Sequence, residues 1–170
     1  DDGEAAITEA DLTTVVDPLL RSPVALKNAR ARTVVIDPGH GGGDMGAIGY
    51  RNIYEKKVVM DVSRRCRRKL RVSGVSVRLT RTGDCALSLE ERTRRAEHWS
   101  ADLLVSIHLN AAANREARGI ETYVLTGAGF ASTSGGDPDD TVWPGNRFDR
   151  QSIVLAYDIH RTLLDLTETP

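Results

Sequence analysis

Three side chains in this sequence are of the types that hold a catalytic metal ion: His40, Glu55 and His108. His40 follows a short β-branched run, His108 follows a second apolar run, and Glu55 lies at the start of a helical pattern. In an open α/β sheet, ligands bind at the carboxyl ends of the strands, where the following helices begin. Two imidazoles and one carboxylate, with a fourth position left for water, form the ligand set of a catalytic zinc site. The sequence therefore predicts a zinc site at this edge of the sheet.

Each of the three residues also has a simpler structural explanation. A histidine at the end of a strand is often a hydrogen-bonded surface residue, and Glu55 has the position of the glutamate in a capping box that starts at Asn52. The spacing of the three residues matches no fixed zinc motif. The glycine-rich stretch 39–49 favours the metal site, because glycines allow another group to approach the backbone closely.

The hydrophobic pattern predicts the elements that position these side chains. We expect helices that begin at Asn52, at Ser88 and at Asp149 or Ser152, and strands at 33–36, 75–79, 103–107 and 119–125. This order predicts an α/β fold, a single three-layer domain whose mostly parallel or mixed central sheet is flanked by helices. Because the last helix has an apolar face with little chain left to cover it, we expect the sheet to lack its last strand.

Length, composition and charge limit the class of protein. The chain has 170 residues, of which 40% are hydrophobic and 28% charged, as in a globular domain. We expect residues 1–32 to form an acidic N-terminal arm or linker and residues 33–170 to form the domain with the metal site. The formal net charge of −1 argues against nucleic acid as the main partner. No apolar run is long enough for a membrane-spanning helix.

The two cysteines, Cys66 and Cys85, define neither a disulfide framework nor a thiolate metal site. Cys66 lies in an apolar helical register, which predicts a buried free thiol. A disulfide between the two requires an oxidising compartment, so their redox state stays open.

Several motifs in order resemble those of zinc-dependent N-acetylmuramoyl-L-alanine amidases, the amidase-3 family. The similarity is close over about residues 33–125 and looser over 146–164. It implies that Zn²⁺ is bound by His40, Glu55 and His108. The residues that carry the similarity are 35–42 (VIDPGHGG), 44–47 (DMGA), 55–58 (EKKV), 79–81 (LTR), 89–92 (LEER), 101–102 (AD), 106–111 (SIHLNA) and 119–123 (GIETY).

The resemblance also implies an activity and a location. The expected reaction is hydrolysis of the amide between N-acetylmuramic acid and L-alanine of the stem peptide, with peptidoglycan or a muropeptide as substrate. The expected place is the bacterial cell wall, in the periplasm or outside the cell, and an activator protein or wall-binding domain stays unidentified. The alternative is a non-catalytic peptidoglycan-binding or regulatory homologue that retains the zinc site.

The expected general acid–base residue is missing from the sequence. Amidases of this type use a glutamate on a late strand, and no segment of the 170 residues matches it. Glu121 lies in a predicted strand but not at the matching position, and Glu168 lacks a strand context, so the catalytic residue besides the ligands is unknown. We expect that the domain is truncated at its C-terminal end or that the chain is a non-catalytic homologue.

Three further polar residues lie close to the predicted ligands in the sequence. Asp37 and Asp44 flank His40 and could orient its imidazole through hydrogen bonds, or could belong to the turns around it. Asn110 could bind the glycan or peptide of the substrate, or cap a turn. The sequence leaves these alternatives open.

Overall fold

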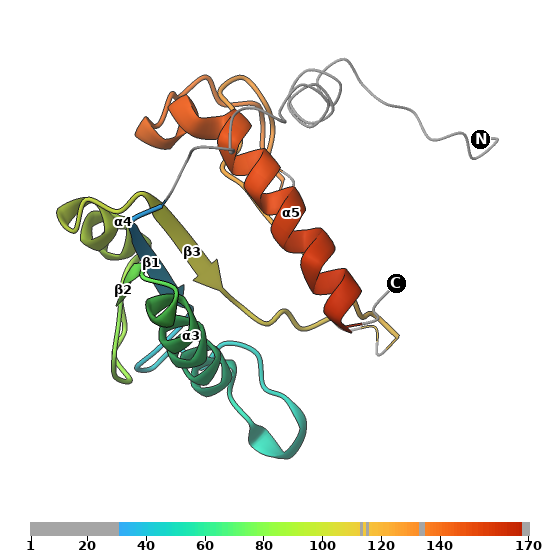
Figure 1. Ribbon diagram of the computed structural model, residues 1–170. Coiled ribbons are helices and arrows are strands. Elements are labelled where there is room, and N and C mark those ends of the chain that lie inside the picture. Colours follow the sequence, from blue (N-terminus) through green and yellow to red (C-terminus); the bar gives the residue numbers. More distant parts are fainter. Residues whose placement is uncertain (1–30, 113, 115, 133–134, 168–170) are drawn as a thin grey trace. The chain divides into compact units, whose positions relative to one another are not determined.

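The computed structural model describes residues 31–112, 114, 116–132 and 135–167 of the chain (Figure 1). These residues form two compact units, one within residues 30–115 and one that includes residues 116–170. The arm predicted for residues 1–32 falls almost wholly outside the described residues, so its boundary stays a prediction. The expectation of a missing last strand also stays a prediction.

A parallel sheet of three strands forms the centre of the first unit (Figure 1). The strands are β1 (Thr33–Pro38), β2 (Ser76–Leu79) and β3 (Leu103–Ile107), in the order β2-β1-β3. The central strand β1 pairs with both neighbours in parallel register. Three of the predicted strands are therefore confirmed, and the α/β class with them.

Helix α3 (Glu55–Val72) packs on β1 and β2. Val34 and Ile36 point to this helix, because alternate residues of a strand share a face. They form one buried apolar cluster with Met60 of α3 and with Val77 and Leu79 of β2. This cluster fixes the start of α3, and with it Glu55, against the carboxyl edge of the sheet.

The opposite face of the sheet carries helix α4 (Leu89–His98). Asp37 is one residue out of phase with Ile36, so its side chain lies on the other face of β1, where it binds Arg92 of α4. The predicted three-layer arrangement is thus confirmed in this unit. The capping box predicted at Ser88 is also present, with Glu91 as its partner.

The start of α3 differs from the prediction. Asn52 does not cap the helix; it ends the short 3-10 helix η2 (Tyr50–Asn52) and has a left-handed backbone with φ of 57°. The cap residue is Tyr54, which makes no side-chain cap hydrogen bond. Glu55 is therefore not a capping-box partner, which leaves its carboxylate available for another role.

The second unit contains η3 (Pro144–Phe148) and α5 (Asp149–Thr167). The last predicted helix is confirmed and begins at Asp149, the first of the two predicted start positions. Residues 126–132 and 135–143 form neither helix nor strand. The strand predicted at 119–125 is wrong, because these residues pair with no strand among those described and an apolar alternating run needs a partner strand. Tyr123, for example, is 65% exposed.

Strand β3 and the two cysteines are less buried than the central strand β1. β3 is half-buried, since Leu104 and Ser106 are exposed. Cys66 and Cys85 are both free thiols; Cys66 is half-buried against the apolar cluster and Cys85 is exposed. Within the described part of the chain, no helix has the length and apolar character needed to cross a membrane.

Candidate metal site

The structure brings His40, Glu55 and His108 together at the carboxyl edge of the sheet. One possible ligand atom from each residue lies within 4.8 Å of the others. Glu55 Oε1 is 3.0 Å from His40 Nε2 and 3.2 Å from His108 Nδ1. The two imidazole nitrogens are 3.1 Å apart. Three ligand atoms from three different segments therefore form a nearly equilateral triangle.

The size of this triangle fits a metal ion. Ligand atoms bound to a tetrahedral Zn²⁺ at about 2.0–2.1 Å lie about 3.3 Å from one another, close to the separations between these three atoms. The Glu55 side chain is 3% exposed, whereas that of His108 is 46% exposed. One side of the triangle is therefore buried in the protein, and the other is accessible to a substrate.

Glu55 is held as a carboxylate by the backbone around it. The N–H of Leu109 donates to Oε1 at 2.6 Å, and the N–H of Ala47 donates to Oε2 at 2.8 Å. Burial raises the pKa of Glu55, but these two donors and the nearby imidazoles outweigh it and keep the pKa below its usual value. The site therefore offers a negative charge to a cation at neutral pH.

Asp44 orients the ring of His40. His40 Nδ1 donates to Asp44 Oδ2 at 2.8 Å, and the N–H of Gly46 donates to Asp44 Oδ1 at 3.0 Å. The hydrogen bond with His40, followed by that from Gly46, lowers the pKa of Asp44 below its usual value. With its proton on Nδ1, the ring directs the lone pair of Nε2 at Glu55 and His108. Asp44 thus takes part both in the contact with His40 and in the turn that follows it, and its role towards a metal ligand stays a prediction.

Two glycines make room for these side chains. A Cβ on Gly39 would lie 2.2 Å from Cε1 of His108, inside the ring's contact distance. Gly46 has φ of +66°, and a Cβ there would lie 2.6 Å from both Glu55 Oε2 and His40 Cδ2. The close approach predicted for the glycine-rich stretch is confirmed at these two positions.

Comparisons with known proteins identify the family. The sequence profile described as N-acetylmuramoyl-L-alanine amidase matches residues 34–170, most of the chain. The chain belongs to this family. The amidase AmiA of Escherichia coli (strain K12) is 38% identical over an alignment of 138 residues, which covers 76% of this chain and 48% of AmiA. AmiC of Neisseria meningitidis serogroup B is 32% identical over 161 residues, 95% of this chain and 38% of AmiC.

A solved structure supports the same assignment. The catalytic domain of CwlV, an N-acetylmuramoyl-L-alanine amidase from Bacillus (Paenibacillus) polymyxa var. colistinus, aligns with a TM-score of 0.54 and 37% identity. The alignment covers 58% of this chain and 56% of that structure. The chain thus spans less than half the length of AmiA and AmiC and about half of the CwlV domain. Amidases of this family are in general metal-dependent, which agrees with the group formed by His40, Glu55 and His108.

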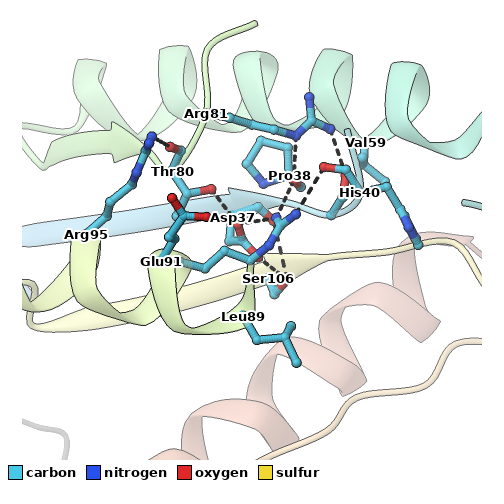
Figure 2. Close-up of polar contacts among 12 residues, drawn as sticks. Asp37, Pro38, His40, Val59, Thr80, Arg81, Leu89, Glu91, Arg95 and Ser106 are labelled. Atoms are coloured by element: carbon cyan, nitrogen blue, oxygen red, sulfur yellow. Dashed lines mark hydrogen bonds and ion pairs between the residues drawn. The ribbon is translucent and has the colours of Figure 1, made fainter. Parts of the chain in front are cut away.

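Asp37 occupies a different place from the one that the sequence suggested. It lies within β1 rather than in a turn, and its buried carboxylate accepts hydrogen bonds from Thr80, Arg92 and Ser106 (Figure 2). Its connection to His40 runs through Arg92, whose Nη2 donates to the carbonyl of His40. Asn110 is exposed and follows the end of β3, so its role in substrate binding stays a prediction.

Sequence reasoning missed the parts played by Arg81 and Arg92. Both guanidinium groups are buried beneath the glycine-rich loop that carries His40. The segments 79–81 and 89–92 fitted the amidase pattern, but no role was inferred for their arginines. A signal was present in α4, because Arg92 and Ala96 are four residues apart and share its buried face.

Neither candidate for the proton shuttle, Glu121 or Glu168, is tested by the structure. Glu121 is exposed in the second unit, where its hydrogen bond raises the pKa of Tyr123. Glu168 lies outside the described residues. The role of Glu121 in proton transfer therefore stays a prediction.

Proposed function

We propose that this chain hydrolyses the amide between N-acetylmuramic acid and the L-alanine of the peptidoglycan stem peptide, with one Zn²⁺ held by His40, Glu55 and His108. The observation that carries the proposal is the triangle of Nε2, Oε1 and Nδ1, with sides of 3.0–3.2 Å, in a chain of the amidase family. Its members AmiA, AmiC and CwlV carry that activity in their names.

The chemistry of the donor atoms favours zinc over magnesium or calcium. Mg²⁺ and Ca²⁺ prefer oxygen ligands, whereas two imidazoles and one carboxylate are a common set for Zn²⁺ at catalytic sites. Bound zinc would polarise the carbonyl oxygen of the scissile amide and activate water at neutral pH.

The residues around the ligands would keep the site in place before substrate arrives. Asp44 fixes the rotation and tautomer of His40, and the N–H groups of Ala47 and Leu109 fix the Glu55 carboxylate. Pre-ordered ligands bind a metal more tightly, since little order is lost on binding. The exposed side of His108 would leave room for the sugar and peptide on either side of the scissile amide.

The substrate sets the place of action. Peptidoglycan lies outside the cytoplasmic membrane, so we place the activity in the periplasm or outside the cell. The sequence similarity to the amidases AmiA and AmiC supports an action on the bacterial cell wall.

The test is hydrolysis of a defined muropeptide by the zinc-loaded chain, followed by chromatography and mass spectrometry. We expect slow release of N-acetylmuramic acid and a peptide with a free L-alanine amino group, because no residue of the 170 matches the late-strand glutamate that would transfer the proton. His108→Ala should abolish this release, whereas His98→Ala, which changes an exposed histidine of α4, should retain it. Cleavage of another bond, or binding of the muropeptide without cleavage, would overturn the proposed activity. The second result would favour the non-catalytic homologue.

A further inference from the structure

The backbone around His40 is held by two buried arginines that the proposed chemistry does not use directly. We infer that Arg92 is a positioning residue that acts with Arg81 to fix residues 38–40, so that the imidazole of His40 faces Glu55 and His108. This inference rests on the proposed function, because it takes these three residues as the metal ligands.

Three consecutive carbonyl groups accept hydrogen bonds from the two guanidinium groups. Arg92 Nη1 donates to the carbonyl of Pro38 at 3.0 Å and Nη2 to that of His40 at 3.1 Å. Arg81 Nε donates to Pro38 at 2.9 Å and Nη2 to Gly39 at 2.7 Å. Figure 2 shows Arg81 beside Pro38 on one side of β1 and Asp37 at the centre of the hydrogen-bonded group. The peptide units before and at His40 are therefore fixed from two directions.

His40 needs such support because of its backbone conformation. Its φ is 57°, in the left-handed region that residues with a side chain rarely adopt. A strained conformation persists only where the surrounding structure imposes it. The hydrogen bonds of Arg81 and Arg92 to the carbonyls on either side of Gly39, and to Gly39 itself, supply that constraint.

Arg92 is in turn linked to the sheet through Asp37 of β1. Its Nη1 is 2.8 Å from Asp37 Oδ1 of β1, and both side chains are at most 10% exposed. The same carboxylate accepts from Thr80, which follows β2, and from Ser106 of β3 at 2.7 Å. A buried charge is tolerated when it is paired and hydrogen-bonded. Asp37 therefore makes Arg92 a rigid connection between the sheet and the loop of His40.

Arg81 connects the same loop to the helix that carries Glu55. Besides Pro38 and Gly39, it donates to the carbonyl of Lys56 at 3.1 Å, one residue after Glu55. The two arginines thus fix the loop of His40 relative to the start of α3, which carries Glu55. The ligand atoms of these two residues are 3.0 Å apart. Lysine cannot reproduce this arrangement, because it lacks the planar fork of several N–H donors.

The experiment compares Arg92→Lys and Arg92→Met with Arg94→Met, which changes an exposed arginine of the same helix. The zinc dissociation constant is measured by competition with a chromophoric chelator, and the visible absorption spectrum is recorded for each chain loaded with Co²⁺. Urea unfolding of the metal-free proteins measures the effect on stability separately. We expect zinc affinity to fall about 10–100-fold in both Arg92 variants, as is usual when a group that supports a ligand is lost. The Co²⁺ spectrum should change as well.

Wild-type affinity together with an unchanged Co²⁺ spectrum in Arg92→Lys would overturn the positioning role. An equal loss of affinity in Arg94→Met would overturn it too, because that side chain touches no part of the loop's hydrogen-bond network. If Arg92→Met does not fold, the lysine variant still decides, since it keeps the charge. If the wild-type chain binds no zinc, both the proposed function and this inference fail. If the wild-type chain binds zinc, the Arg92 variants test the positioning role by itself.

Discussion

The absence of a side chain at Gly39 determines whether the rings of His40 and His108 can approach each other. Their centroids are 4.8 Å apart, nearly edge to face at 77°. A Cβ on Gly39 would overlap all three of the nearest atoms of the His108 ring, at 2.2–2.6 Å. The phi angle of Gly39 is not in the left-handed region, so this residue is required for space rather than for conformation.

We therefore predict that Gly39→Ala displaces His108 and weakens zinc binding by at least about 10-fold. Gly43→Ala is the matched control, because it lies in the same loop and a Cβ there would meet no atom within 4 Å. Both affinities are measured by chelator competition. Equal affinities in the two variants would show that the ring has room to move without loss of the site.

Hydrogen bonds at the start of α4 and at the start of β1 hold these two elements in place. The capping box of Ser88 and Glu91 satisfies backbone N–H groups at the start of α4, which carries Arg92. At the start of β1, Asp102 Oδ2 accepts from the N–H groups of Thr33 and Arg32, each at 2.8 Å. None of these residues is a candidate metal ligand, yet they hold the elements that position the ligands.

Loss of the cap should destabilise the fold. We predict that Ser88→Ala lowers the free energy of unfolding by about 1 kcal/mol, the usual cost of removing a serine cap. Thr93→Ala, at an exposed position of the same helix, should change it by less than about 0.5 kcal/mol. Urea unfolding curves of the metal-free proteins give both values. A Ser88→Ala curve that coincides with the Thr93→Ala curve would mean that the cap contributes nothing to stability.

Asp102 should make stability depend on pH. The N–H groups of Thr33 and then Arg32 lower its pKa below the usual value. A carboxyl whose pKa is lowered on folding stabilises the fold above its unfolded pKa of about 3.9, and this contribution disappears as the pH falls through the folded pKa.

We therefore predict that Asp102→Asn has a lower urea midpoint than the wild type at pH 7, and that the difference shrinks below about pH 3. The midpoints are measured for both proteins over this pH range. A difference that is constant with pH would assign the effect to packing rather than to the charge.

At the scale of the whole molecule, much of the first unit follows from local sequence patterns. The strands at 33–36, 75–79 and 103–107 are short apolar or alternating runs, and α4 begins with a readable capping box. Parallel pairing of β1 with β3 then places His40 and His108 at one edge, so their convergence with Glu55 was predictable. The parallel order of the strands therefore predicted the metal site better than the spacing of its three residues in the sequence.

Features that depend on tertiary contacts were not predictable in the same way. Asn52 has the type of a helix cap, but it adopts a left-handed backbone before the helix begins. Arg81 and Arg92 bind carbonyl groups of a distant loop, and backbone carbonyls leave no pattern in a sequence. Residues 119–125 have the composition of a strand, yet they form none, since a strand requires a partner.

The central claim is that His40, Glu55 and His108 hold one zinc ion, and elemental analysis tests it most directly. The wild type, His40→Ala, His108→Ala and the control His98→Ala are loaded with Zn²⁺, dialysed against metal-free buffer and analysed for zinc per chain. The account predicts about one zinc in the wild type and in His98→Ala, and far less in the other two, because a catalytic zinc site needs three protein ligands. A wild type without zinc, or zinc retained in both His40→Ala and His108→Ala, would contradict it.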